Sequence, residues 1–211
     1  MPMNALTPLP LVHEKRYVAK PMQSPVGTLI LVATESGLAA VLLEGDSPHR
    51  HELQIAGTRF GHPILDEAHR QILSYFSGER TAFDLPIDVG GSVFQRQVWG
   101  ALLAIPYGET RSCGQVVRSV GRSVPADLAR DAIGQNPLAV VVPCHRVVGP
   151  HLVLAGFSGG EAIHETLRGV ECGNARFGDD RWIQGRATQR SGASPVRHSS
   201  SRHPLLPSRS A

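Results

Sequence analysis

The sequence predicts an α/β N-terminal domain followed by a mainly α-helical C-terminal domain that contains a helix-turn-helix. Two observations lead to this prediction. Before the glycine pair at 90–91, apolar residues follow strand-like and then helical periods, whereas after it short helices are marked by serine caps and proline or glycine stops. We therefore expect an N-terminal domain over residues 1–90, a C-terminal domain over 91–175 and a separate tail over 176–211.

The N-terminal elements follow from the apolar pattern. Residues 27–45 (GTLILVATESGLAAVLLEG) predict two strands joined by a turn at 35–37. Residues 63–76 place apolar side chains on one helical face, and Gly78 lies just past the end, where a helix should stop. Strand-like residues follow at 83–89.

Three helices are expected in the C-terminal domain, and each has a serine at its start. Ser92 can cap the first helix and Ser112 the second. Ser123, which a proline follows closely, opens the third helix, and this helix ends at the asparagine–proline pair 136–137. The second and third helices, joined by a glycine-containing turn, have the outline of a helix-turn-helix.

The remaining elements surround a valine-rich segment. Residues 140–148 (VVVPCHRVV) predict a strand, and a glycine-rich loop at 155–160 precedes a final helix over 161–169. From residue 176 onward the chain is rich in serine, arginine, proline and glycine and poor in apolar residues, which is typical of a disordered segment.

The net charge of +3 is unevenly distributed along the chain. Six of the 21 lysines and arginines lie after residue 180, whereas all 18 acidic residues lie before it or at it, so residues 1–180 carry a net charge of −3. This argues against a uniformly positive surface for nucleic acid on the folded domains. We hypothesise that the basic tail adds non-specific DNA affinity by neutralising phosphates.

Cysteine usage and the lack of long apolar runs limit the class of protein. No apolar run is long enough to cross a membrane and the start lacks the order of a secretory signal, so a cytoplasmic protein without membrane contact is expected. The three cysteines, Cys113, Cys144 and Cys172, are odd in number and form no CxxC pair. They therefore argue against a disulfide framework and against a zinc site, and leave a thiol free to act as a nucleophile.

The segment 140–148 places Cys144, His145 and Arg146 in succession among valines. Buried polar side chains need partners, so this arrangement is costly unless each finds one. A thiol becomes an effective nucleophile when a base takes its proton, and a carboxylate commonly orients an imidazole base. Neighbours in a strand point to opposite faces, so Cys144 and His145 can cooperate only at a turn, which Pro143 favours. The candidate carboxylates downstream are Glu161, Glu165 and Glu171.

The motif PCHRV closely resembles the active-site motif of the methylated-DNA–protein-cysteine methyltransferases, or alkylguanine-DNA alkyltransferases. The surrounding pieces agree with this family in order and spacing: FQRQVW at 94–99, IPYGET at 105–110, NP at 136–137, GFSGG at 156–160 and Glu171. A Cys–His pair alone would more often be a buried small residue beside a surface histidine. The resemblance covers about residues 17–175 and is strongest from 94 to 171.

The resemblance implies a fold and a reaction. The fold is a ribonuclease-H-like α/β N-terminal domain with a C-terminal, winged-helix-like domain that holds the helix-turn-helix. In the reaction, double-stranded DNA with an O6-alkylguanine is bound and the damaged base is flipped into a pocket. Cys144 then takes the alkyl group irreversibly, so that one protein repairs one lesion. The resemblance implies no metal or other cofactor, and we expect a monomer.

The resemblance also implies roles in the chemistry. Cys144 would be the acceptor, and His145 would act as a base through a water molecule. Glu171 would hold the histidine and balance its charge. Asn136 would brace the turn before the active-site segment. Arg146 is expected to be a structural ion-pair partner rather than a chemical participant.

Further roles concern the guanine and the DNA. The main chain of Cys144 and Val147 would read the guanine edge, with Phe157 and Ser158 of the glycine-rich loop in the substrate pocket. Ser112, at the start of the second helix, would face the DNA.

Three positions depart from the family pattern. Cys113 stands where members have a tyrosine that holds the flipped base, and it is either inert or a second thiol that can be alkylated. Asp127 stands where members have an arginine that enters the base stack, and its carboxylate would repel phosphates. Arg130, close to one helical turn away, is the candidate replacement. His164 replaces a lysine that is common after the glycine-rich loop.

These departures keep a second function open. The main hypothesis is a DNA repair methyltransferase that works once, by transfer to Cys144. The alternative is an alkyltransferase-like protein that binds damaged DNA with weak or no transfer, which Cys113 and Asp127 favour. A cysteine hydrolase is a third possibility, but the helix-turn-helix gives no reason for one.

Overall fold

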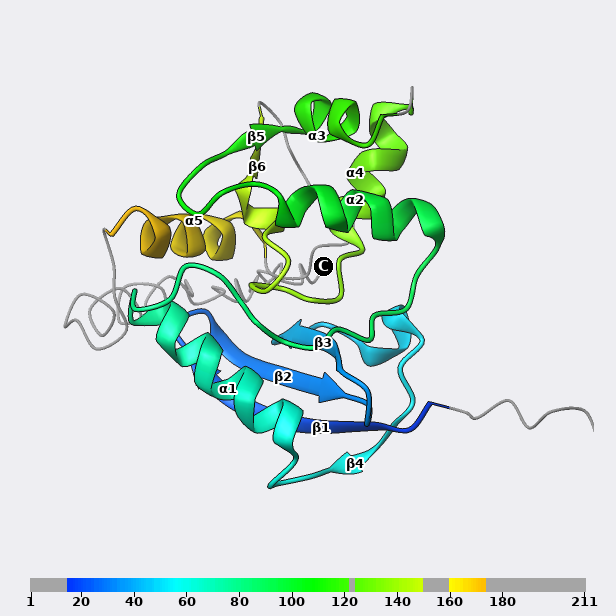
Figure 1. The fold of residues 1–211 in the computed structure, drawn as a ribbon, viewed down its shortest axis with the longest axis vertical. Helices are drawn as coiled ribbons and strands as arrows, with labels where there is room; N and C mark the ends of the chain where they lie inside the picture. The colour runs from blue at the N-terminus through cyan, green and yellow to red at the C-terminus, as the bar shows by residue number, and fades with distance from the viewer. Residues whose placement is uncertain (1–14, 122–123, 150–159, 174–211) are drawn as a thin grey trace, which may run out of the picture.

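The computed structural model describes residues 15–121, 124–149 and 160–173. It contains a sheet domain and a mainly helical domain that pack against each other (Figure 1). This is the α/β and helical organisation expected from the sequence. Ser123, most of the glycine-rich loop and the tail from residue 176 lie outside the described residues. No helix within the described parts is long and apolar enough to cross a membrane.

The N-terminal domain is built on a four-stranded sheet of order β3-β2-β1-β4. Strands β1 (Tyr17–Ser24), β2 (Gly27–Ala33) and β3 (Leu38–Leu43) are antiparallel neighbours, and β4 (Ile55–Thr58) runs parallel to β1. The 3-10 helix η1 (Pro48–His51) lies between β3 and β4 in the chain.

Strands β2 and β3 confirm the predicted pair, whereas β1 and β4 were not predicted. Pro21 lies within β1, and a proline normally argues against an inner strand because it cannot donate a hydrogen bond to the ladder. Strand β4 is short and its last three residues are exposed, so it shows no apolar alternation.

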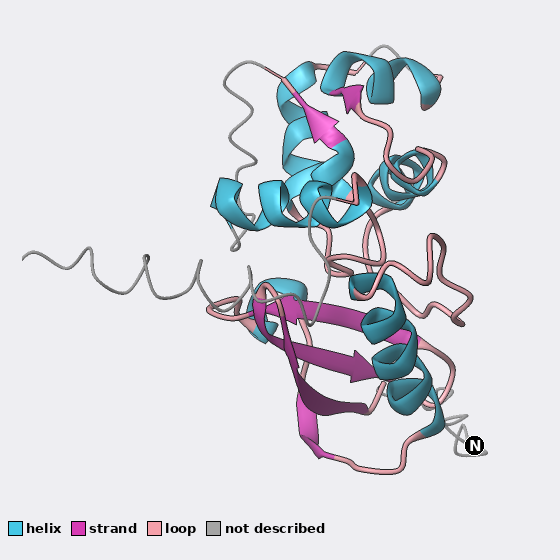
Figure 2. Ribbon diagram, turned by 90° about the vertical axis from the view of Figure 1, so that its left-hand side faces the viewer, coloured by secondary structure: helices cyan, strands magenta, loops and turns pink. Residues whose placement is uncertain are grey.

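Helix α1 (Pro63–Phe76) has the predicted bounds and covers one face of the sheet (Figure 2). Gly78 has a φ of 77°, a left-handed conformation that glycine adopts without strain, just after the helix ends. The buried face of α1 includes two polar side chains that the apolar pattern did not single out, Gln71 and Tyr75.

Two of the three helices predicted for the C-terminal domain begin at the predicted serines, whereas the third does not begin at Ser123. Ser92 forms a capping box with Gln95 at the start of α2 (Val93–Leu103), and Ser112 forms one with Gln115 at the start of α3 (Cys113–Ser119). Helix α4 (Ala126–Gly134) packs against α3 and completes the helix-turn-helix, but its N-cap is Pro125, with no side-chain cap.

The predicted strand over 140–148 is wrong. The chain turns tightly there, because Val142 N–H donates to the carbonyl of Leu138 (2.8 Å) and Val141 N–H donates to that of Ala139 (2.8 Å). A buried apolar run does not by itself distinguish a strand from other buried backbone. Only β6 (Val147–Val148) is extended, and it pairs in parallel with β5 (Arg111–Ser112).

The strand expected at 83–89 is also absent as a regular element, but part of it pairs with β3. Leu38 N–H donates to Pro86 O (2.7 Å) and Asp88 N–H donates to Leu38 O (2.9 Å). Gly37 allows this approach, because a Cβ there would lie 2.8 Å from Asp88 N and from Pro86 O.

Further along the outer edge of β3, the hydrogen-bond partners come from the C-terminal domain. Val41 N–H donates to Pro137 O (2.8 Å), and Ala139 N–H donates to Val41 O (3.2 Å). The larger of two apolar clusters in the described residues runs from the sheet through α1 into the helical domain, and it includes Cys144. The segment that leads to the active-site motif is thus hydrogen-bonded to the N-terminal sheet.

Candidate active site

Cys144 begins the short 3-10 helix η2 (Cys144–Arg146), where the backbone turns directly after Pro143. The turn before it is held by Asn136, whose Nδ2 donates to Val142 O (2.9 Å) and whose Oδ1 accepts from Leu138 N–H (3.0 Å). Val140, within this turn, has a φ of 71°, which is rare for a β-branched residue. Cys144 is therefore presented by a tightly held and strained turn.

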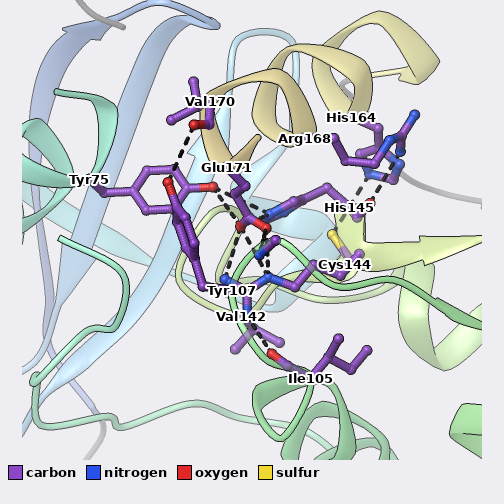
Figure 3. A network of polar contacts seen from close by, with 12 residues as sticks. Tyr75, Ile105, Tyr107, Val142, Cys144, His145, His164, Arg168, Val170 and Glu171 are labelled. Carbon is purple, nitrogen blue, oxygen red and sulfur yellow. Dashed lines mark hydrogen bonds and ion pairs between the residues drawn. The ribbon is translucent and has the colours of Figure 1, made fainter. Parts of the chain in front are cut away.

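The carboxylate of Glu171, at the end of α5 (Gly160–Glu171), is the centre of the polar network (Figure 3). Its Oε1 lies 2.8 Å from His145 Nε2 and accepts from Tyr75 Oη (2.9 Å). Arg146 binds both carboxylate oxygens, at 2.9 to 3.1 Å, and Gly108 N–H donates to Oε2 (3.0 Å). Of the three candidate carboxylates, Glu171 is the one at the motif, whereas Glu161 and Glu165 are exposed.

These contacts determine the protonation of His145. Burial alone would raise the pKa of Glu171, but hydrogen bonds from His145 and Arg146 outweigh it and lower the pKa to about 2. Glu171 is thus a carboxylate, so His145 carries its proton on Nε2 and donates it to Glu171. Tyr75 Oη, 3.4 Å from the same Nε2, donates to Glu171 as well.

His145 Nδ1 is consequently an acceptor. This atom is buried and has no partner among the described residues. Burial lowers the pKa of His145, with the hydrogen bond that its Nε2–H donates to Glu171 acting in the opposite direction, so the resting imidazole is neutral. A neutral imidazole with a free nitrogen lone pair is what a general base requires.

Cys144 is 1% exposed, and burial raises the pKa of its thiol to about 11. Its Sγ lies 3.8 Å from Nε2 of His164, on the buried face of α5. The resting cysteine is a neutral thiol, and a base must take its proton before or during attack.

Arg146 has the structural role expected for it. Besides its ion pair with Glu171, Nη1 donates to Ile105 O (2.5 Å) and the guanidinium lies 5.8 Å from the centre of the Tyr107 ring. Arg168 Nη1 donates to the carbonyl of His145 (3.1 Å) and fixes the backbone of η2 from the side of α5.

Two side chains of this network were missed as functional residues. Tyr75 belongs to the N-terminal domain, and the signal for it was a tyrosine within a buried helical face, since a buried phenol normally has a hydrogen-bond partner. His164 was noted only as a departure from a family pattern. Its contact with Cys144 follows from its place on α5, two helical turns before Glu171 on the same buried face.

Of the residues expected to contact the guanine or the DNA, Val147 lies in β6, Ser112 and Cys113 lie at the start of α3, and Asp127 and Arg130 lie in α4. Val147 follows η2, and its N–H donates to the carbonyl of Cys144, which keeps a second lone pair for a ligand. Cys113 is half-buried, with Sγ 3.9 Å from Ala126 O, and burial raises its thiol pKa. The hydroxyl of Ser112 caps α3. Phe157 and Ser158 lie outside the described residues.

The two candidates on α4 bind each other. Asp127 Oδ1 accepts from Arg130 Nη1 (2.6 Å), and 84% of the Asp127 side chain is exposed, against 35% for Arg130. The carboxylate therefore faces solvent, and Arg130 is tied to it rather than free. Within the described part of the chain, no group of three or more histidine, cysteine or acidic side chains is arranged to hold a metal ion.

Two family models match this chain. The model described as 6-O-methylguanine DNA methyltransferase, ribonuclease-like domain, matches residues 18–89, and the model for the DNA binding domain of the same proteins matches residues 93–172. Together they cover both domains of the structure.

Known proteins similar to this chain include methylated-DNA–protein-cysteine methyltransferases. The one from Mycolicibacterium paratuberculosis is 39% identical over 150 residues (71% of this chain and 89% of the relative), and the one from Methanosarcina acetivorans is 35% identical over 151 residues (71% and 94%). Among solved structures, Mycobacterium tuberculosis OGT in complex with DNA matches with a TM-score of 0.66 at 34% identity, covering 80% of this chain and 99% of that one.

Proposed function

The chain belongs to the methylated-DNA–protein-cysteine methyltransferase family, and we propose that its acceptor is Cys144, served by His145, Glu171 and Asn136. The protein takes a methyl group from methylated DNA onto one of its own cysteines. The observation that carries the assignment of residues is the buried Nδ1 of His145, directly beside Cys144 in the chain: it has no partner within the described part of the structure, and Nε2 is bound to Glu171.

The proposed lesion is O6-alkylguanine in double-stranded DNA. The sulfur of Cys144 attacks the alkyl carbon, a carbon–sulfur bond forms, and the bond from that carbon to O6 breaks with its electron pair going to the guanine. The thiol proton passes through a water molecule to His145 Nδ1. Glu171 balances the charge of the resulting imidazolium, and the guanine anion takes up a proton. The thioether is stable, so each protein acts once.

DNA engagement is proposed to use the helix-turn-helix of α3 and α4, with Cys113 and the main chain of Val147 beside the flipped base. Phe157 and Ser158 are proposed, from their position in the family motif, to complete the pocket. We propose that the protein acts as a monomer, because all the side chains of the network, from Tyr75 to Glu171, come from one chain.

The test is intact-mass analysis after incubation with a duplex that contains O6-methylguanine. One methyl group per protein is expected, peptide mapping should place it on Cys144, and Cys144→Ser should remove all transfer. Repeated release of demethylated DNA by a small amount of protein would contradict the single-turnover assignment. Binding to the duplex without any mass change would favour the damaged-DNA-binding alternative.

A further inference from the structure

Cys144 has a second imidazole beside it. Its Sγ lies 3.8 Å from His164 Nε2, within the range of a hydrogen bond that involves sulfur, and both residues are buried, at 1% and 7% exposure (Figure 3). His145, the motif histidine, uses its Nε2 for Glu171 instead. Helix α5 thus supplies two different supports two turns apart, Glu171 for His145 and His164 for Cys144.

The direction of this hydrogen bond follows from the chemistry of its two atoms. We infer that neutral His164 carries its proton on Nδ1, because a thiol that donates to an imidazole nitrogen makes a better hydrogen bond than an N–H that donates to sulfur, a weak acceptor; Nε2 of His164 is then the acceptor. A hydrogen bond made by the neutral form of a group disfavours its ionised form. The contact therefore favours the thiol of Cys144 over the thiolate.

The surroundings keep His164 neutral. Burial lowers its pKa to about 3, and the neighbouring His145 and Arg168 act in the same direction. Arg168 is bound to the carbonyl of His145, and the charge of Glu171 is taken up by Arg146 and His145. His164 is hence a neutral imidazole at working pH rather than a cation that would stabilise a thiolate.

We propose that His164 is a positioning residue that holds resting Cys144 as a thiol and so protects it from soluble alkylating agents and oxidants. Cys144 then reacts when a flipped base presents its alkyl carbon and the proton leaves toward His145. The inference deepens the proposed function, since it rests on Cys144 as the acceptor. It also explains what the presence of histidine in place of the family's lysine changes, because the ammonium group of a lysine at position 164 would favour the thiolate of Cys144.

The first experiment detects the hydrogen bond between Cys144 and His164 directly, by infrared spectroscopy. The S–H stretching band of Cys144 is isolated as the infrared difference between the natural protein and Cys144→Ser, and the same difference is taken in a His164→Phe background. In the natural protein the band should lie at lower frequency and be more intense than with phenylalanine, which has no acceptor. An unchanged band would show that the thiol does not donate to His164 and would overturn the proposal.

The second experiment measures reactivity without DNA. Alkylation of Cys144 by iodoacetamide is followed by peptide mapping from pH 6 to 10, roughly the span of ordinary thiol titration. His164→Lys should move the rate profile to lower pH by about 1–3 units, and the neutral-pH rate should rise about 3- to 30-fold after the lower nucleophilicity of a more acidic thiol is included. His69→Lys, which adds the same charge on α1, should leave the profile in place.

The outcomes separate this proposal from the proposed function. If thermal melting shows that His164→Lys is folded, but its alkylation rate keeps the pH profile of the natural protein, the proposed protecting hydrogen bond is contradicted, whatever the activity on DNA. Failure of methyl transfer from DNA in the natural protein would instead contradict the assignment of Cys144 as acceptor. The infrared bands remain decisive for the hydrogen bond in either case.

Discussion

Individual side chains explain how a neutral thiol and a neutral imidazole can be kept ready for reaction in a buried site. Glu171 gathers hydrogen bonds from four residues, and these place the proton of His145 on Nε2 and leave Nδ1 as the acceptor. Arg146 supplies the charge that a buried carboxylate needs. The carboxylate is thus a structural ion-pair partner and, in the proposed reaction, the group that orients the base.

Replacement of Glu171 by glutamine should impair both stability and transfer. The glutamine side chain would keep the shape but leave the buried Arg146 without a counter-charge, so we expect a loss of about 3–5 kcal/mol in the free energy of unfolding. Transfer from methylated duplex should slow about 100- to 10,000-fold, because the base loses its orienting charge. The control is Glu165→Gln, an exposed glutamate on the same helix. Transfer at the natural rate in Glu171→Gln would contradict the role of the carboxylate.

The same carboxylate should make the protein sensitive to acid. The pKa of Glu171 is lowered from 4.5 to about 2 in the folded state, so its contribution is fully present above about pH 4.5 and is lost as the pH falls toward 2. The contribution is on the order of 3 kcal/mol. Denaturant unfolding at several pH values should show the stability difference between the natural protein and Glu171→Gln shrinking across this window. A constant difference would mean that Glu171 is not ionised through these contacts.

Among the helices and strands, those with local signals were predicted well. Helix α1 has the predicted bounds, and Ser92 and Ser112 cap α2 and α3 as expected, because caps and periodicity are properties of neighbouring residues. The apolar pattern predicted a strand where the chain turns before Cys144, because this turn depends on the side chain of Asn136 and on pairing with β3, which are contacts beyond neighbouring residues. Only the family resemblance implied that Asn136 braces a turn there.

The residues proposed for the chemistry were predicted in the same uneven way. Cys144, His145 and Glu171 followed from the motif, and Asn136 from its place in the family pattern. The functional contacts of Tyr75 and His164 required knowledge of how α1 and α5 pack around η2. A side chain that serves the site through tertiary packing leaves no pattern in its own neighbourhood.

Helix α4 should bind DNA more tightly without its exposed carboxylate. Asp127→Asn removes a charge that repels phosphates and releases Arg130, so duplex affinity at low salt should rise. If Arg130 then contacts one phosphate, the slope of log affinity against log salt should steepen by about 0.9. Glu35→Gln is a matched control, because Glu35 is 82% exposed and also paired with an arginine, Arg59, in the N-terminal domain. Equal salt slopes for natural protein and Asp127→Asn would place Arg130 away from the DNA.

The two domains together form one site. Tyr75 reaches from α1 to the carboxylate at the end of α5, and residues 137–139 add to the edge of the N-terminal sheet. The N-terminal domain thus supports the proposed site although it supplies neither the proposed nucleophile nor the proposed base. Its sheet holds the segment that carries the motif, and its helix completes the hydrogen bonds of Glu171.

The substitution Tyr75→Phe should lower the stability of the protein, because it removes this contact between the two domains. The buried carboxylate would lose one donor of four, and we expect a loss of about 1.5–3 kcal/mol in the free energy of unfolding, typical of a hydrogen bond to a charged group. Denaturant unfolding measures it, with Tyr17→Phe on β1 as the control hydroxyl deletion in the same domain. A loss no larger than that of the control would show that Glu171 does not depend on the phenol.

The pairing along the outer edge of β3 has a consequence for the synthesis of the protein. All six residues of β3 are buried in the folded protein. The hydrogen bonds along its outer edge are made by residues 86–88 at one end and by 137–139 at the other, which are synthesised later than β3. At roughly 5–20 residues per second, a ribosome needs about 5–20 s to go from residue 43 to residue 139. During that interval the nascent chain presents an apolar strand with open hydrogen-bonding groups, the kind of surface to which other extended chains add. The segment that leads to Cys144 is therefore also the segment that ends this exposure.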